Sequence, residues 1–514
     1  MLGALIEGRN IVNFVAKLSF HSGILIALQH IILSGVIRFF NQLYGISCYK
    51  INAILYLFNG ANIIDNAYLQ ANGKPFEVQT PGRKHHMVTS SKHLNEINYA
   101  PLDVLSLHAV AKDFLQPKHT MHGFEWQDVR GREGTGFVRA LRTVLAGQLP
   151  DLIPCLKEVI EDHLEGELKS FETSTGTSNL VVYDVAKTLV AKANCTVFFG
   201  SHLAQDHEFF EAACQFPHDS AFAAEIIRCL PHPIGTFLAR RATRNYRCAS
   251  RLHELLTHEI AQRLAQSSKD GADISNEQND GLQWLIDTSP KKNPWSVDRI
   301  VGEVMGIWYG SVHTLSIAMT FAIFDLYTRQ EYVEPLRAEL EEINLGNFKG
   351  QPAELPLLDS FLRESARLSA FESTGIRRQA LQQFTFSDGL KVHKGDWVCV
   401  PHRSMMRDDA YFSNALHFNG FRFVQRSEQK ENFSANASDG RSQLVGAEYV
   451  WGYGRIVCPG RFYATVLLKL VLSTMLMKYD CKMPNIRGTG SFQWRSSIIP
   501  KRSITITVRR RDGE

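Results

Sequence analysis

The stretch WGYGRIVCPGRFYA, residues 451–464, places a single cysteine inside a glycine-rich turn. Gly452 and Gly454 permit backbone angles that other residues avoid, so the approach to the cysteine is predicted to be a tight loop. The apolar segment that follows is long enough for a buried helix. Pro459 suits the first position of that helix. Cys458 is therefore expected at a helix N-terminus, where the dipole and the free N–H groups favour a thiolate.

Composition excludes several classes of function. The chain has 514 residues, with 56 Lys and Arg against 52 Asp and Glu, so its net charge of +4 gives no concentrated basic face for nucleic acid. None of its 9 cysteines forms a C-x-x-C pair, which disfavours a structural zinc site. An odd count without regular spacing also disfavours a disulfide framework. Cys458 alone has a local context that indicates chemistry.

The N-terminal part contains a candidate membrane segment. Residues 18–37, LSFHSGILIALQHIILSGVI, carry no formal charge and match the span of a bilayer, although His21, Gln29 and His30 lower the hydropathy. A signal peptide fits less well, because Glu7 is present and no small-residue cleavage site follows. We expect an N-terminal segment, residues 1–40, with a transmembrane or interfacial anchor helix, and one catalytic domain over residues 41–514.

The remaining pattern predicts a mainly α fold with small β-sheets (α+β). Strand-like pieces occur at residues 75–78 and 85–90, and the alternation at 384–401 and 491–508 predicts further strands. Helical periodicity dominates from Gly136 onward. Pro294-Trp295-Ser296 is expected to cap a long apolar helix over residues 297–327.

Three further motifs precede the cysteine loop in a fixed order. The sequence GSVHT ends at Thr314 in the long apolar helix, where a small residue and a hydroxyl could open a groove toward a ligand. Glu364 and Arg367 have the i, i+3 spacing of a helical ion pair within an apolar segment. A buried pair needs additional hydrogen bonds, and Arg422 between aromatic residues offers such a partner.

This order and spacing resembles the cytochrome P450 family, the haem-thiolate monooxygenases, from about Leu55 to the C-terminus. WGYGRIVCPGR resembles the family's cysteine loop, and GSVHT its oxygen-binding helix. The sequences HTMHGFEW and CPGRFYA are similar to segments of fungal enzymes of secondary metabolism. The resemblance implies that Cys458 is the axial ligand of a haem iron, with a structural charge triad of Glu364, Arg367 and Arg422, a catalytic pair of Thr314 and His313, and a haem-binding set of Cys458, Arg377, Arg455, Trp451, Gly452 and Gly460.

Three positions depart from the family's pattern. Trp451 replaces the usual phenylalanine near the sulfur and adds a hydrogen-bond donor. Ile456 stands where the family usually has an arginine or histidine for a haem propionate, a role that Arg455 is a candidate to take over. His313 replaces the acidic residue before Thr314, and its expected pKa near neutrality leaves two roles open, proton relay or packing.

The implied reaction inserts one oxygen atom from O2 into a hydrophobic small molecule. The cofactor is haem b, and electrons come from NADPH through an NADPH–cytochrome reductase, with cytochrome b5 as a second candidate donor. The similarity to fungal enzymes of secondary metabolism suggests a terpenoid, polyketide or modified peptide as substrate. The membrane segment implies the endoplasmic reticulum, with the catalytic domain facing the cytosol.

Three other functions were weighed against this one. A thiolate-haem isomerase or dehydratase would work without an external electron donor, and a haem-binding sensor would work without turnover. Thr314 argues against both. A cysteine phosphatase would need an arginine about six residues after the cysteine, but Ala464 stands there, so this function is excluded.

Overall fold

The structure is a computed structural model that describes residues 48–124, 138, 140–171, 176–267, 279–343, 348–351, 354–424, 450–484 and 490–511. The chain forms two compact units, Met1–Leu55 and Tyr56–Glu514. Every described element except the beginning of helix α3 belongs to the second unit. The predicted anchor helix at residues 18–37, and with it the predicted division at residue 40, lie outside the described residues.

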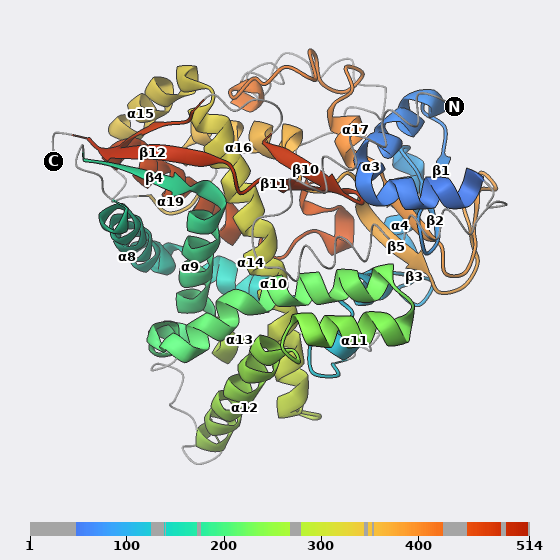
Figure 1. The fold of residues 1–514 in the computed structure, drawn as a ribbon, viewed down its shortest axis with the longest axis horizontal. Coiled ribbons are helices and arrows are strands. Elements are labelled where there is room, and N and C mark those ends of the chain that lie inside the picture. The colour runs from blue at the N-terminus through green and yellow to red at the C-terminus, as the bar shows by residue number, and fades with distance from the viewer. Residues whose placement is uncertain are drawn as a thin grey trace. The chain divides into compact units, whose positions relative to one another are not determined.

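Helices make up most of the second unit, as Figure 1 shows. The helical elements are α3 (Cys48–Ala71), α4 (Ser91–Tyr99), α5 (Leu107–Leu115), α6 (Pro117–Thr120), the π-helix η1 (Ala140–Leu145), α8 (Ala146–Ser170), α9 (Val182–Gln205), α10 (His207–Cys229), α11 (His232–Ala242), α12 (Arg247–Ser267), α13 (Gly281–Asp287), α14 (Val297–Tyr327), η3 (Gln330–Tyr332), α15 (Val333–Glu342), α16 (Pro356–Leu368), α17 (His402–Met406), η7 (Gly454–Ile456) and α19 (Arg461–Lys478).

The strands form four small sheets. A five-stranded sheet has the order β1-β2-β8-β5-β3, a three-stranded sheet the order β4-β12-β9, and β10-β11 and β6-β7 are hairpins. The strands are β1 (Phe76–Gln79), β2 (Lys84–Met87), β3 (Leu105–Ser106), β4 (Thr177–Val181), β5 (Gly375–Ala380), β6 (Phe384–Thr385), β7 (Lys391–Val392), β8 (Trp397–Val400), β9 (Tyr479–Lys482), β10 (Ser491–Trp494), β11 (Ser497–Pro500) and β12 (Thr505–Arg510).

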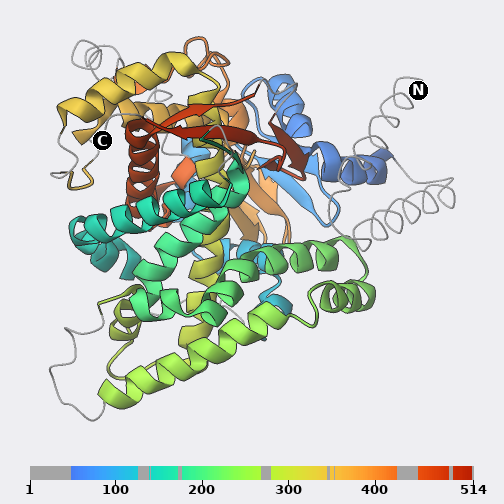
Figure 2. The same cartoon turned by 60° about the vertical axis from the view of Figure 1, so that its left-hand side comes forward.

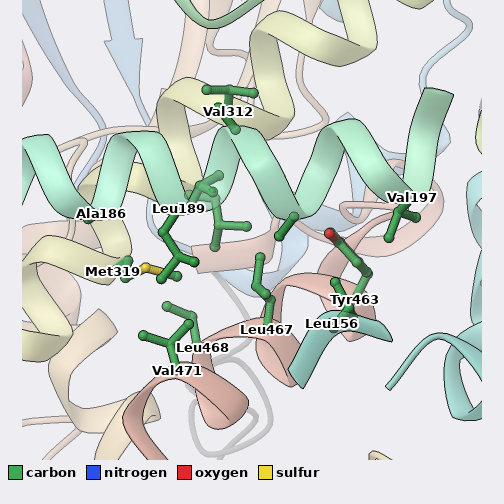
Figure 3. Packing of buried hydrophobic residues seen from close by; sticks show 14 of the residues in the cluster. Leu156, Ala186, Leu189, Val197, Val312, Met319, Tyr463, Leu467, Leu468 and Val471 are labelled. Carbon is green, nitrogen blue, oxygen red and sulfur yellow. The ribbon is translucent and has the colours of Figure 1, made fainter. Parts of the chain in front are cut away.

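Helix α14 is the central element of this unit. It contacts α9, α10, α12, α16, α19 and β11, and it crosses the helical part in both Figure 1 and Figure 2. Its N-terminus is fixed by Ser296, whose hydroxyl accepts the Arg299 N–H at 3.3 Å. Figure 3 shows apolar side chains of α14, α9 and α19 packed together, among them Met319, Leu189 and Val471. Burial of these side chains holds α14 beside the helix that follows the cysteine loop.

The predicted elements agree with the structure where their patterns are strong. The mainly α fold, the capped helix over residues 297–327 and the apolar helix after the cysteine loop are confirmed. The strands predicted over residues 491–508 are present as β10, β11 and β12: β10 and β11 form a hairpin, while β12 pairs with β4 and β9. Within the described residues, α14 is the one helix long and apolar enough to cross a membrane, and it is largely buried in the core.

Candidate active site

The cysteine loop has the tight geometry that its glycines predict. Gly452 and Gly454 have φ values of 95° and 60°, which side-chain-bearing residues rarely adopt. A Cβ at Gly454 would lie 2.1 Å from Oδ1 of Asn98. The N–H of Cys458 donates to the carbonyl of Trp451 at 2.7 Å and closes the loop. The glycines are therefore required both by the turn and by the close approach of α4.

The thiol of Cys458 has its pKa set mainly by burial. Burial raises the pKa of its thiol, although the N–H groups of Gly460 and Arg461 and the charges of Arg461 and Arg142 act to lower it. Without a metal, burial therefore has a larger effect on the thiol pKa than the N–H groups and charges that favour a thiolate. Pro459 also precedes the helix, since α19 begins at Arg461 with Gly460 as its N-cap. A bound metal would change the balance, because a coordinating thiol loses its proton.

An arginine from the π-helix η1 holds the cysteine loop. Nη2 of Arg142 donates to the carbonyls of Arg455 at 2.8 Å and Val457 at 3.2 Å. These carbonyls lie in the turn that leads directly to Cys458. The sequence interpretation treated this segment as an ordinary helix and missed Arg142, since no local motif marks a side chain whose partners lie more than 300 residues away.

Glu364, Arg367 and Arg422 come together as a buried ion cluster. Arg367 donates twice to the Glu364 carboxylate at 2.8 Å, and both side chains are fully buried. Nε of Arg422 donates to the same carboxylate at 3.1 and 3.2 Å. The remaining donors of the two guanidinium groups bind backbone carbonyls of Met406, Ala415, Ser413, Asn414 and His417. The cluster therefore ties the irregular segment before the cysteine loop to helix α16.

The middle of α14 has an accessible face. Gly310 is exposed although this helix is mostly buried, and a Cβ built there would meet no atom within 4 Å. Thr314 is half-buried one turn later and lies about 40° around the helix from Gly310. Its hydroxyl forms no hydrogen bond within the described part of the chain. Thr314 thus lies one turn from the exposed position of Gly310 and on nearly the same side of the helix.

His313 has a different environment from the one expected. Burial lowers its pKa to about 4, so the ring is neutral at pH 7 and the expected titration near neutrality is wrong. Its ring lies 5.7 Å from that of Tyr309 and 6.2 Å from that of His218 on α10. His313 and Thr314 lie on opposite sides of the Gly310 face, because successive residues turn by about 100°.

The predicted propionate-binding arginines already have partners. Arg377 forms an ion pair with Glu372 and donates to Oγ1 of Thr374 at 2.9 Å. The guanidinium of Arg455 donates to the carbonyls of Asn98 at 2.7 Å and Ala100 at 3.0 Å. Both guanidinium groups thus bind protein groups through Nε and Nη2, and their role toward a haem propionate stays a prediction.

Arg378, which the sequence interpretation did not single out, is a buried cation with no acidic partner among the described residues. It is 3% exposed, and its one hydrogen bond within the described residues goes to the carbonyl of Arg377 at 2.8 Å. Burial, and then the positive charge of Arg455, lowers its pKa to about 10, so it remains charged. A buried charge without a counterion is costly, and the place therefore suits an anion.

The residues present fit a haem. A lone cysteine in a loop clamped by Arg142 can hold an iron atom, and Arg378 can meet a carboxylate of the macrocycle. An accessible helix face with a hydroxyl can border the opposite side. On the same helix, Trp308 and Leu315 are buried in the core, and the Trp308 N–H donates to the carbonyl of Ala213 at 2.8 Å. The side chain of Trp451 forms no hydrogen bond within the described residues.

Comparisons with known proteins agree with this geometry. The family model "Cytochrome P450" matches residues 126–507. Cytochrome P450 monooxygenase 151 of Postia placenta is 27% identical over 478 residues, covering 90% of this chain and 91% of that protein. Cytochrome P450 monooxygenase janQ of Penicillium janthinellum is 25% identical over 480 residues, covering 91% and 92%. The structure titled "Retinoic acid bound cyanobacterial CYP120A1" has the same fold, with a TM-score of 0.65 at 16% identity, covering 89% of this chain and 97% of its own.

Proposed function

Because this chain belongs to the cytochrome P450 family of oxidoreductases, we propose that it inserts one oxygen atom from O2 into a hydrophobic small molecule of secondary metabolism. A terpenoid, a polyketide or a modified peptide is the substrate class. The observation that carries the proposal is the clamped cysteine loop, in which Arg142 and the two glycines fix Cys458. Electrons come from NADPH through an NADPH–cytochrome reductase, with cytochrome b5 as a second donor. An N-terminal anchor holds the enzyme at the endoplasmic reticulum membrane.

Cys458 would hold a haem at its iron, and Arg378 would bind a propionate. When bound, it supplies the activation of O2, which an anionic sulfur ligand favours by donating electron density. The N–H groups of Gly460 and Arg461 hydrogen-bond to the sulfur and thereby tune its basicity. Arg455 adds positive charge near Arg378. The protein thus fixes the cofactor's position and the charge around it, while the cofactor does the oxidation.

Thr314 holds a proton at Oγ1 on the accessible face of α14. Because this hydroxyl forms no hydrogen bond with any described residue, it can bond a water and pass a proton to the reacting oxygen. His313 is neutral at pH 7 and cannot serve as an imidazolium donor. The proton path we propose therefore runs through Thr314 and water.

Thr314→Ala is expected to lower product formation by about 100-fold, the usual effect of losing a positioned proton donor. NADPH and O2 consumption should continue, so that the ratio of product to NADPH falls. Thr320→Ala is the control, because the Thr320 hydroxyl donates to the carbonyl of Ser316 inside the helix. Equal ratios of product to NADPH in the Thr314 variant and the wild type would contradict the assigned role.

Arg378→Leu is expected to weaken haem binding by about 10- to 100-fold, the effect of losing one charged hydrogen bond. The measurement is haem transfer to apomyoglobin. Arg377→Leu is the comparison, since its guanidinium pairs with Glu372. Faster haem loss from the Arg377 variant, with normal retention by the Arg378 variant, would restore Arg377 as the propionate ligand.

The function itself is tested by isotope incorporation. The full chain, a fungal reductase and NADPH are incubated under labelled O2 with terpenoids, polyketides and cyclic peptides. Mass spectrometry should find one labelled oxygen atom in a product that forms only when NADPH is present. A rearranged product of unchanged composition, formed without NADPH, would instead support the isomerase alternative.

A further inference from the structure

A group of polar aromatic residues lies beside the open face of α14. Tyr309 and His313 come from α14, His218 from α10 and Tyr183 from α9. The ring of His218 lies 6.2 Å from that of His313 and 6.0 Å from that of Tyr183. Three helices thus bring these side chains to one place, next to the helical turn that carries Thr314.

These four side chains form few hydrogen bonds with one another. One hydrogen bond joins them, between the Tyr183 hydroxyl and Nε2 of His218 at 3.4 Å. His313 forms none within the described residues, and its Nδ1 is enclosed without a partner. A neutral imidazole offers one donor and one acceptor. Because Nδ1 is enclosed, a ligand at the accessible face would meet the other ring nitrogen, Nε2, which is not enclosed and forms no hydrogen bond within the described residues. Polar groups in native proteins are usually paired, so Nε2 is available to a ligand.

The charges of the surroundings favour a neutral ligand group. Burial lowers the pKa of His218 to about 3 and that of His313 to about 4, so neither ring is protonated at pH 7. Glu372 and Lys187 act on His313 in opposite directions. A hydroxyl, carbonyl or ether oxygen can bond a neutral imidazole without burying a charge, whereas a carboxylate cannot.

We propose that His313, flanked by Tyr309 and His218, hydrogen-bonds an oxygen atom already present on the substrate while Thr314 faces the carbon that is oxidised. The substrate is then an apolar molecule that already carries an oxygen function, rather than a hydrocarbon. An earlier reaction that introduces a hydroxyl, carbonyl or ether must supply it. This inference rests on the proposed function and names the substrate class of the same site.

The test uses matched probe pairs that differ by one oxygen function: adamantane with adamantanone, and androstane with androstanone. Binding to the haem-loaded full chain is measured by equilibrium dialysis, which does not depend on turnover. The wild type should bind the ketones about tenfold more tightly than the hydrocarbons, the effect of one satisfied hydrogen bond. His313→Phe should reduce that ratio to about one.

Two further variants separate recognition from folding. His313→Gln keeps a donor and an acceptor and should retain part of the preference. Ser316→Ala is the matched control on the same helix, because the Ser316 hydroxyl donates to the carbonyl of Val312 and is buried. Its preference should equal that of the wild type.

The proposal is overturned if the wild type binds no ketone, if it binds ketone and hydrocarbon equally, or if His313→Phe keeps the preference. The spectrum of the reduced protein under carbon monoxide is recorded on every sample. A missing thiolate band in the wild type would sink the proposed function, whereas a thiolate band with no ketone preference would sink this inference alone.

Discussion

Arg367→Ala is expected to destabilise the protein by about 3–5 kcal/mol, the cost of removing one partner of a buried ion pair. The Glu364 carboxylate would keep Arg422 and the Asn419 N–H but lose both bonds from Arg367. The carbonyls of Met406 and Ala415 would lose their donor as well. Because these carbonyls belong to the segment before the cysteine loop, haem occupancy should fall with stability. Urea unfolding and haem content per chain measure the two effects.

The control for Arg367 lies one turn earlier on the same helix. Arg363 pairs with Asp359 at 3.8 Å, and its side chain is 41% exposed. Exposed pairs contribute little, so Arg363→Ala should change stability by less than about 1 kcal/mol. Equal losses of unfolding free energy in the two variants would mean that any substitution on helix α16 destabilises the protein. The buried ion cluster would then have no stabilising role of its own.

Cys458→Ala is expected to abolish product formation while the second unit stays folded. The side chain is half-buried in a loop, and the change to alanine removes only one sulfur atom, so its loss should cost less than about 1 kcal/mol of stability. Without the sulfur, a bound haem would have no ligand from this loop and would lose the electron donation that favours activation of O2. Labelled-oxygen incorporation and circular dichroism measure activity and fold on the same samples.

Cys155→Ala serves as the control for Cys458, because Cys155 is half-buried on α8 and burial raises its pKa as well. This variant should retain wild-type activity. Product formation by Cys458→Ala at the wild-type rate would show that the cysteine loop does not carry the chemistry.

Local pattern was sufficient wherever one segment determines its own structure. The apolar run after the cap at Ser296 predicts α14, and the spacing of Glu364 and Arg367 predicts a pair on one helix face. The paired glycines predict the turn before Cys458. In each of these cases the physical cause lies within a few residues of its effect.

Features that depend on distant contacts were missed or misjudged. Arg142 reaches a loop more than 300 residues away, and Arg378 differs from Arg377 only in which neighbours surround it. The thiol of Cys458 and the ring of His313 both have pKa values set by burial, which a sequence window does not report. The anchor predicted at residues 18–37 stays a prediction.

The most direct test of the central claim is the absorption spectrum of the dithionite-reduced full chain under carbon monoxide, recorded for the wild type and for Cys458→Ala. A thiolate-bound haem should give a strongly red-shifted Soret band in the wild type that is absent from the variant. A wild type without that band, or a variant that keeps it, would contradict the assignment of Cys458 as the haem ligand and with it the proposed function.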